Sequence, residues 1–600
     1  MEENKIRQRS EIPEEDKWAI EDIYPSDEAW EEDLAKVETE QALLVSFAGH
    51  LAESGEKLYE YLMNSERVDV LVGRLAGYCM RRADEDTRVA KYQGMVGKFY
   101  GIVVALSAAT SFETPEIMAI SDEDMDRFYA ECPKLERFRR YLTNMRRRRA
   151  HTLSAEEERL LAAAGEMAQA PDNIYGMFAD ADLTFADAID AEGKAHPLSQ
   201  GTFVALESGS DRVLRKSAYE NLYNGFGAFK NTAAGLLNAQ NKQLKFFAEA
   251  RKYNNAFEAS LDATNVPTSV YLNLIEAVHQ NMDKMHRYVR LRKKLLGVDE
   301  LHFYDIYTPL LPADDQKIPF NTAKENILEA VKPLGEEYGA IIKEGFEKRW
   351  IDKYQNEGKR SGAYSSGVKV HPFVLMNYND TLNSEFTLAH EMGHAMHSYL
   401  SNRTQNPMDA SYVIFVAEVA STCNEALLME YLLNKTTDKK ERIYLINHFL
   451  DQFKGTIYRQ TMFAEFELNI GRMVAEGQTL TADVLSAEYK RLNELYYGPD
   501  MVVDDYIALE WERIPHFYYN YYVFQYATGY SAAIALSRRI LNEGEEAVKD
   551  YIGFLSGGCS KSPIELLRGA GVDMESPAPV NQALELFGKL LDEMEELMAE

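Results

Sequence analysis

The chain has 600 residues, of which 46% are hydrophobic and 27% charged, and its formal net charge is −31. This strongly acidic balance argues against nucleic acid and anionic membranes as partners, because both repel a negatively charged surface. Its four cysteines are widely separated and form no CxxC pair, which argues against a disulfide framework and against a cysteine metal site.

The N-terminal residues, MEENKIRQRSEIPEED, are polar and lack the apolar run of a signal peptide. No stretch of 18 apolar residues follows, so the sequence predicts no membrane span and a cytoplasmic location. Segments 66–82 and 154–170 have apolar residues at the three- and four-residue spacing of helices. Ser154 and Glu157 form a predicted capping box at the start of the second helix. We interpret the basic run 146–149 as a charged helix end.

A change of pattern marks the predicted domain boundary. Residues 171–201 contain Pro, Gly and Asp at irregular spacing, and they predict a loop region with a small hairpin. We therefore expect an N-terminal helical domain, 1–200, and a C-terminal domain, 201–600. Within the second domain, residues 361–378 predict the clearest strand pair of the chain, which leads directly into a helix.

That helix, at about 384–399, carries the motif His-Glu-Met-Gly-His at residues 390–394. Positions i and i+4 lie on one face of a helix, so His390 and His394 can bind one metal ion together. Neutral imidazole is a standard zinc ligand, and Glu391 is placed to activate a metal-bound water. Apolar residues surround most of the helix, which predicts that it is buried and that its histidines need a partner.

The third metal ligand must come from another segment. His397 lies too far along the same helix from His390 to bind the same ion, so we expect it to support the site or to pack. Residues 412–432 predict a strongly apolar returning helix with Glu418 and Glu425 on one face. Buried carboxylates need a partner, which makes Glu418 the predicted ligand. Glu425 is then expected to orient a ligand histidine through a hydrogen bond.

A further constellation lies near the C-terminus. Residues 514–530 read IPHFYYNYYVFQYATGY, with His516 after a proline and four tyrosines at four-residue spacing. Tyr and His side chains are suitable hydrogen-bond donors for the oxyanion of a tetrahedral intermediate. The spacing alone also fits a packed core face, and it does not say which tyrosine would act; the four are Tyr518, Tyr522, Tyr526 and Tyr530.

Together these motifs resemble the thimet-oligopeptidase family of zinc peptidases, and within it the oligoendopeptidase F branch. Segments 9–13, 22–26 and 358–364 resemble the same branch, so the likeness spans nearly the whole chain. The resemblance implies a mainly α, bilobed zincin-like fold. It also implies a small β-sheet beside the active-site helix, a deep channel for short peptide substrates, and a catalytic role for the predicted domain 201–600.

The resemblance further implies roles for individual residues. His390, His394 and Glu418 match the ligands of one Zn²⁺ per chain, and Glu391 matches the general base. His516 matches a histidine that contacts substrate or stabilises the transition state. Two departures stand out. Ala420 replaces a proline that many relatives have, and the tyrosines align only with a one-residue shift. That shift favours Tyr526 as the oxyanion donor and leaves Tyr522 and Tyr530 as alternatives.

The predicted activity is hydrolysis of internal peptide bonds in short oligopeptides. An exposed strand edge near Ala363 is expected to hold an extended peptide by main-chain pairing. One alternative is a zinc carboxypeptidase, in which Arg360 would bind the C-terminal carboxylate of the substrate. Others are a peptide-binding relative without catalysis, which the intact motif disfavours, and a structural zinc site, which usually has four protein ligands.

Overall fold

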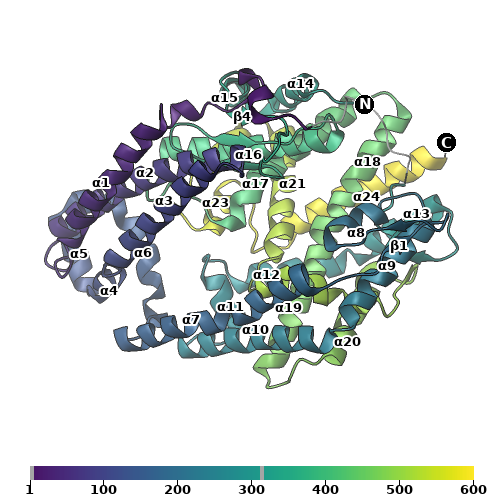
Figure 1. Cartoon of the computed structure of the whole chain (residues 1–600), viewed down its shortest axis with the longest axis horizontal. Helices are drawn as coiled ribbons and strands as arrows, with labels where there is room; N and C mark the ends of the chain where they lie inside the picture. Colours follow the sequence, from purple (N-terminus) through teal and green to yellow (C-terminus); the bar gives the residue numbers. More distant parts are fainter. Residues whose placement is uncertain (1–5, 311–316, 600) are drawn as a thin grey trace. The chain divides into compact units, whose positions relative to one another are not determined.

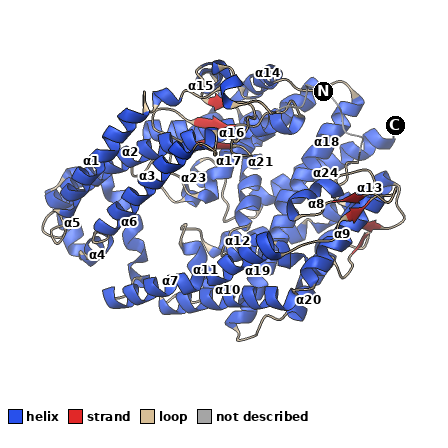
Figure 2. Ribbon diagram, viewed as in Figure 1, coloured by secondary structure: helices blue, strands red, loops and turns tan. Residues whose placement is uncertain are grey.

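The computed structural model describes residues 6–310 and 317–599. Helices make up 72% of the chain and strands 3%, which confirms the predicted mainly α architecture with small sheets (Figure 2). The described residues form two compact units. Unit 1 comprises 6–152, 317–432 and 536–572, and unit 2 comprises 153–310, 433–535 and 573–599. These divisions differ from the predicted boundary at residue 200, which stays a prediction.

Unit 1 contains the motif helix and the three-stranded sheet. Its helices are α1 (Asp27–Val45), α2 (Gly55–Glu85), α3 (Ala90–Ala109), α4 (Glu113–Ala119), α5 (Asp122–Glu131), α6 (Arg139–Arg146), α14 (Phe320–Ala330), α15 (Glu336–Glu347), α16 (Leu382–Thr404), α22 (Glu545–Leu555) and α23 (Pro563–Gly569). Helices α1, α2 and α3 lie side by side, as Figure 1 shows. The chain passes between the units within α17 (Ile414–Lys435) and α21 (Phe524–Glu543).

Unit 2 is almost entirely helical. Its helices are α7 (Ala155–Gly176), α8 (Gln200–Glu207), α9 (Arg212–Gly227), α10 (Lys230–Ala250), α11 (Ala256–Asp262), α12 (Thr268–Gln280), α13 (Met282–Leu296), α18 (Lys439–Phe453), α19 (Arg459–Ala475), α20 (Ala482–Tyr497) and α24 (Ala578–Ala599). Strands β1 (Ala188–Ile189) and β2 (Ala195–His196) form the predicted hairpin, and β3 (Leu301–His302) pairs in parallel with β7 (Met501–Val502).

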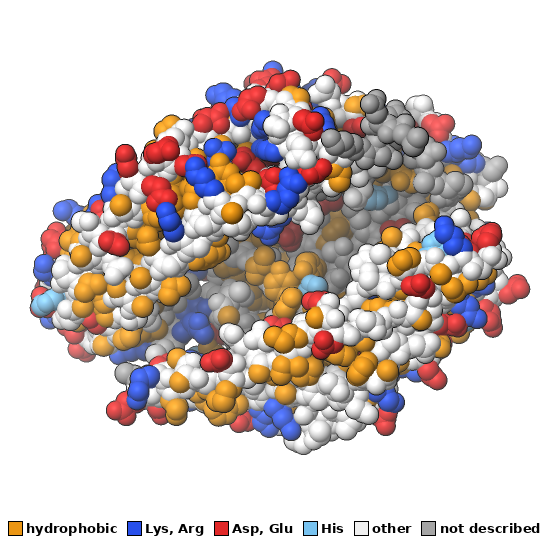
Figure 3. Space-filling view, in the orientation of Figure 1, with side chains coloured by type: hydrophobic (Ala, Val, Ile, Leu, Met, Phe, Trp, Pro, Cys, Tyr) orange, Lys and Arg blue, Asp and Glu red, His pale blue; other side chains and the backbone are white. Residues whose placement is uncertain are grey.

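Local sequence signals explain where several helices begin and end. Ser154 and Glu157 form the predicted capping box at the start of α7, with reciprocal bonds of 3.4 and 3.0 Å. Helix α6 ends at Arg146, and residues 147–151 continue as a short 3₁₀ turn, so the basic run lies at a helix end as expected. On the face drawn in Figure 3, acidic, basic and apolar side chains are interspersed.

A three-stranded sheet of order β4-β6-β5 lies beside α16. Its strands are β4 (Ile351–Asp352), β5 (Tyr364–Ser366) and β6 (Phe373–Leu375), and β5 pairs with β6 in an antiparallel manner. The predicted strand pair before the motif helix is therefore confirmed. The side chain of Asp352, fully buried on β4, accepts hydrogen bonds from Arg9 at 2.8 Å and from Lys359 at 2.6 Å. The bond from Arg9 thus connects the N-terminal segment to strand β4.

One described stretch, Ala90–Ala119, is long and apolar enough to cross a membrane by length and composition alone. Only 17% of its most apolar 18-residue stretch is buried inside the protein. This finding differs from the expectation that the sequence contains no such stretch, because that expectation required an unbroken apolar run. Helices of soluble proteins meet the same criteria, so both the cytoplasmic location and the absence of a membrane partner stay predictions.

Candidate active site

Three side chains of unit 1 meet around a common point. His390 and His394 project from α16, Glu418 projects from α17, and one ligand atom of each lies within 4.8 Å of the others. The Nε2 atom of His390 lies 3.1 Å from Nε2 of His394 and 3.3 Å from Oε2 of Glu418. The Nε2 atom of His394 lies 3.6 Å from the same carboxylate oxygen. Two imidazole nitrogens and one carboxylate oxygen form a donor set suited to a divalent transition metal.

Neighbouring side chains orient these donors. Nδ1 of His390 lies 2.6 Å from Oε1 of Glu425, one of the predicted supporting residues. A proton on Nδ1 would donate to this carboxylate and leave the Nε2 lone pair directed at the common point. On α17, the hydroxyl of Ser421 donates to Oε2 of Glu418 at 3.2 Å. Ser421 is not among the predicted site residues, although its position three residues after Glu418 puts it on the same helical face.

The arrangement leaves polar atoms that a metal and its water would satisfy. The imidazoles of His390 and His394 present their Nε2 atoms to each other, where a cation can bind both lone pairs. Glu391 is 6% exposed, and its Oε2 atom has no hydrogen-bond partner among the described residues. A buried carboxylate oxygen without a partner is costly, so a ligand at this position is expected. The residues present therefore fit a metal site.

Gly393, in the middle of the motif, allows α17 to approach α16 closely. A Cβ atom at this position would lie 2.6 Å from the carbonyl oxygen of Ala420 and 2.6 Å from the Cα atom of Ser421. Both atoms belong to the backbone of α17, so they cannot move aside without moving the helix. Glu418 lies on the same turn of α17, which means that the small residue at 393 sets the distance between the two ligand-bearing helices.

Burial and neighbouring charges shift the pKa values of the site in different directions. Burial tends to lower the pKa of His390, but the carboxylates of Glu418 and Glu425 outweigh it and raise this pKa well above its ordinary value. Burial raises the pKa of Glu391, and the two histidines only partly offset the rise. For Glu418, burial is outweighed by hydrogen bonds from the histidines, which lower its pKa. A bound cation would instead favour neutral imidazoles.

His397 does not share the site of its neighbours. It is 1% exposed, and its ring stacks on Tyr412 with 3.7 Å between the ring centroids. Burial lowers its pKa to about 3, so the imidazole is neutral. The structure thus places His397 in packing, one of the two roles expected for it.

A second cluster lies in unit 2, around His516. His516 lies in a 3₁₀ turn, Pro515–Tyr518, and its Nε2 atom is 3.4 Å from the hydroxyl of Tyr526 on α21. The ring of Tyr522 lies 5.4 Å from that of Tyr526 and 6.4 Å from that of His516. Burial lowers the pKa of His516, which favours a neutral ring. The structure therefore brings one imidazole and two half-buried phenols together.

The tyrosines of this segment do not form one helical face, despite their four-residue spacing. Helix α21 begins only at Phe524, so of the four just Tyr526 and Tyr530 lie on it. Tyr530 is 6% exposed and packs on Phe453 at 5.2 Å, in the interior of unit 2. Left-handed backbone at Asn520 and Tyr521 interrupts the segment before Tyr522.

The strand candidate lies at the edge of the three-stranded sheet. Ala363 directly precedes β5, which pairs with β6 on one side and contacts α16. Arg360 is 61% exposed and forms a 3.4 Å ion pair with Asp84. Its guanidinium also lies 5.6 Å from the ring centroid of Tyr364 on β5.

Comparisons with known proteins cover nearly all of the chain. Residues 205–586 match the model of peptidase family M3, and residues 116–185 match a model described as oligopeptidase F. Oligopeptidase PepF of Bacillus subtilis is 45% identical over 596 residues, which cover 99% of this chain and 89% of that protein. The chain belongs to peptidase family M3.

Further M3-type relatives support the same assignment. An oligoendopeptidase F homologue of Lactococcus lactis is 39% identical, with 99% of each chain covered. The crystal structure of oligoendopeptidase F from Enterococcus faecium has a TM-score of 0.74 and 38% identity, and the match covers 96% of this chain and 99% of that one. The protein is therefore a peptidase that acts on peptide substrates. Membership of M3 implies a metal, for which His390, His394 and Glu418 lie close enough together.

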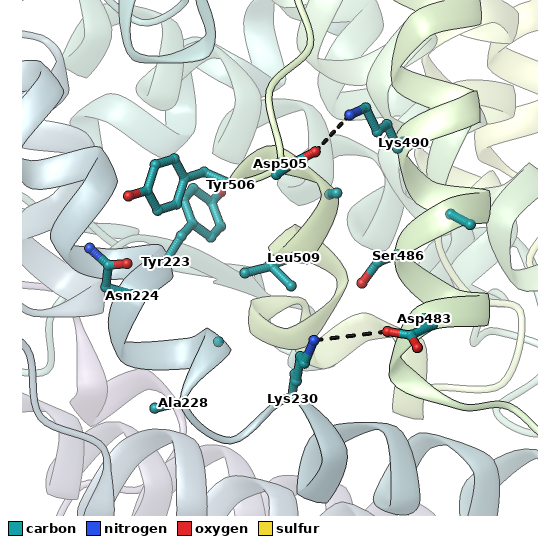
Figure 4. A pocket seen from close by; sticks show the side chains of 13 residues that line it. Tyr223, Asn224, Ala228, Lys230, Asp483, Ser486, Lys490, Asp505, Tyr506 and Leu509 are labelled. Atoms are coloured by element: carbon teal, nitrogen blue, oxygen red, sulfur yellow. Dashed lines mark hydrogen bonds and ion pairs between the residues drawn. The ribbon is translucent and has the colours of Figure 1, made fainter.

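Unit 2 of this M3 peptidase also contains a cavity of about 630 Å³ that includes no predicted site residue. It is lined by α9, α20 and the 3₁₀ helix Ile507–Arg513. Ion pairs of 3.8 Å between Lys230 and Asp483 and of 2.7 Å between Lys490 and Asp505 lie along it (Figure 4). Its cationic and anionic side chains are thus already paired with each other.

Proposed function

We propose that this M3 peptidase is a zinc-dependent endopeptidase that cleaves internal bonds of short oligopeptides. The observation that carries the proposal is the convergence of His390, His394 and Glu418 beside the buried carboxyl group of Glu391. The names of its relatives, oligopeptidase and oligoendopeptidase, support the same substrate class. Zinc is the metal that this combination of two imidazoles and one carboxylate binds in many hydrolases.

The three ligands would hold one Zn²⁺ and leave a fourth position open. When bound, zinc supplies a Lewis acid that polarises the scissile carbonyl and lowers the pKa of a water molecule. The hydrogen bond between His390 and Glu425 keeps the imidazole in the tautomer that binds metal. Ser421 orients the carboxylate of Glu418 in a similar way.

Glu391 transfers the proton in this mechanism. Its carboxylate accepts a proton from the attacking water, and the resulting acid donates the proton to the leaving amine. Burial raises the pKa of Glu391 towards the pH of the reaction, which makes both transfers favourable. The unpartnered Oε2 atom is the atom available for this exchange.

The cluster around His516 would stabilise the negative charge that develops on the carbonyl oxygen. A neutral His516 and the hydroxyl of Tyr526 can each donate one hydrogen bond to an oxyanion. Tyr522, next to both, is a candidate for substrate contact, as is Tyr530, although burial of Tyr530 disfavours it. The predicted substrate channel stays a prediction.

The edge of the sheet offers a way to hold a peptide without reading much of its sequence. Strand β5 is an outer strand, and Ala363 just before it and Ser365 and Ser366 within it have small side chains. Main-chain pairing with an extended substrate would place the peptide beside α16, which carries the motif.

A cleavage assay on peptides with both ends blocked tests the proposal. An endopeptidase cuts such peptides, whereas a carboxypeptidase that used Arg360 requires a free C-terminal carboxylate. Removal of metal with a chelator should abolish cleavage, and one equivalent of Zn²⁺ per chain should restore it. Cleavage only at free C-termini, or full activity of chelated protein free of metal, would refute the proposal.

A further inference from the structure

The segment between His516 and Tyr522 contains two consecutive residues in the left-handed backbone region. Asn520 has φ of +57° and Tyr521 has φ of +61°. Asparagine tolerates this region, but a bulky side chain such as tyrosine rarely adopts it. Strained backbone of this kind persists only where the surrounding structure fixes it. The contacts around Tyr521 therefore show what determines the position of the segment.

Two buried side chains from neighbouring helices hold the turn. Glu467 of α19 is 5% exposed, and its Oε1 atom accepts a 3.1 Å hydrogen bond from the backbone N–H of Tyr521. Gln240 of α10 is 3% exposed, and its amide donates to the carbonyl of Tyr518 at 3.0 Å and to the side chain of Asn520 at 2.9 Å. Both residues of the left-handed pair, and Tyr518 just before them, are thus fixed from the interior of unit 2.

The side chain of Tyr521 is also fitted closely to α19. Its ring packs against Phe257 at 5.4 Å and Tyr271 at 6.1 Å. Its hydroxyl lies against Gly471, where a Cβ atom would approach within 2.0 Å of it. Helix α19 therefore supplies both a small residue for the ring and an acceptor for the backbone.

We propose that Glu467 is a positioning residue for the peptidase reaction, which fixes the left-handed turn and through it the places of His516, Tyr522 and Tyr526. The inference rests on the proposed function for the roles of these three residues. Hydrogen-bond donors to an oxyanion must be placed accurately, and a displacement of about 1 Å can cost roughly 100-fold in rate. Glu467 acts through the backbone of Tyr521 and needs no contact with substrate.

Glu467 has a protonation state suited to this role. Burial raises its pKa to about 8, so the side chain is a neutral acid at neutral pH. Among the described residues, no cation forms an ion pair with it. Titratable and charged groups around Glu467 and the turn include the phenols of Tyr271 and Tyr521, Arg472, the Glu465 carboxylate with its partners His279 and Tyr496, and Lys245. As the pH rises through about 8, an unpaired carboxylate forms in the interior behind the turn.

Two substitutions separate this role from a purely structural one. Glu467→Gln keeps an oxygen acceptor and stays neutral at every pH, so it imitates the protonated acid. Glu467→Ala removes the acceptor. Thr461→Val is a matched control, because Thr461 is a fully buried polar residue on α19 with an unpartnered hydroxyl and no bond to the turn.

We expect Glu467→Ala to lower kcat by about 100-fold at saturating zinc with little change in KM. Glu467→Gln should restore kcat at pH 7. Its kcat/KM should also fall less steeply above pH 8 than that of the wild type. The proposal would be overturned if kcat/KM fell equally steeply above pH 8 in the wild type and in Glu467→Gln. An undiminished kcat in Glu467→Ala would also overturn it.

Hydrogen exchange provides a readout that does not depend on activity. The peptide covering 514–526 should exchange faster in Glu467→Ala at pH 7 than in the wild type, Glu467→Gln or Thr461→Val. If the zinc-loaded wild type cleaves no peptide, the proposed function is wrong, and the exchange result alone then decides whether Glu467 fixes the turn. Equal exchange in all four proteins would refute the positioning role even in an active enzyme.

Discussion

Replacement of Gly393 by alanine tests how the two ligand-bearing helices are held at their distance. The added Cβ atom would lie 2.6 Å from two backbone atoms of α17 and 2.9 Å from the backbone nitrogen of Ser421. Ordinary van der Waals contact begins near 3.4 Å, so the helices must separate by about 0.8 Å to accommodate it. Overpacking of this kind typically costs about 1–3 kcal/mol of stability. In an isolated helix the same change would be favourable by about 1 kcal/mol.

This displacement of the helices is large compared with the variation in metal–ligand distance that a metal site tolerates. Metal–ligand distances vary by about 0.2 Å, so a shift of Glu418 by several times this value should weaken binding. We expect about a 10- to 100-fold loss of zinc affinity, similar to the loss of a supporting hydrogen bond. Competition with a chromophoric chelator measures it, alongside the Tm of the metal-free protein.

Gly339→Ala is the matched control for this prediction. Gly339 lies within α15 of the same unit, and no atom lies within 4 Å of a Cβ atom placed there. This variant should be as stable as the wild type or slightly more stable, with unchanged zinc affinity. If Gly393→Ala also bound zinc as tightly as the wild type, the close approach of α17 would not be what places Glu418.

Four further predictions concern single side chains. Glu391→Gln should retain zinc but lose about 10²- to 10⁴-fold in kcat, and wild-type rates in that variant would contradict its role as general base. Glu425→Ala should weaken zinc binding about 10- to 100-fold in chelator competition, because His390 loses its orienting bond; unchanged affinity would count against this. Ser365→Pro should lower kcat/KM without loss of zinc, as it removes a backbone donor from β5, and identical kinetics would exclude strand addition there. Glu512, 1% exposed with both oxygens unpartnered, has its pKa raised to about 8, so the folded state binds the proton more tightly than the unfolded state. The free energy of unfolding should therefore fall as the pH rises from about 4.5 to 8, and Tm should fall with it. In Glu512→Gln the fall in Tm over this pH range should be smaller, and an equal fall in the variant and the wild type would contradict the prediction.

Residue patterns within single helices and strands allowed much of the fold to be predicted. Apolar residues around 384–399 predicted a buried helix, and α16 spans Leu382–Thr404. The strand pair before it and the capping box at Ser154 depend on neighbouring residues alone, and both are present. The structure also places Glu418 beside the two histidines, a grouping suggested by a carboxylate on an apolar helical face.

Features that depend on contacts between distant segments could not be predicted in this way. Nothing in the motif indicates that Gly393 faces the backbone of α17, because the motif describes one helix and not the helix that packs against it. The left-handed turn at Asn520 and Tyr521 contains no glycine and lies within a run of tyrosines at helical spacing, so the sequence does not mark it as a turn. Its contacts with Glu467, 54 residues earlier in the chain, and with Gln240 account for it.

The two parts of the proposed site are thus held by different means. The ligands lie on two regular helices whose distance depends on one glycine, while the proposed oxyanion donors lie on an irregular segment braced by a buried acid. Because the two supports share no residue, perturbing either one should affect a different quantity. Gly393→Ala acts first on zinc affinity, and its effect on turnover should be recovered at high zinc. Glu467→Ala acts on turnover at any zinc concentration, because the ligands in unit 1 are unchanged.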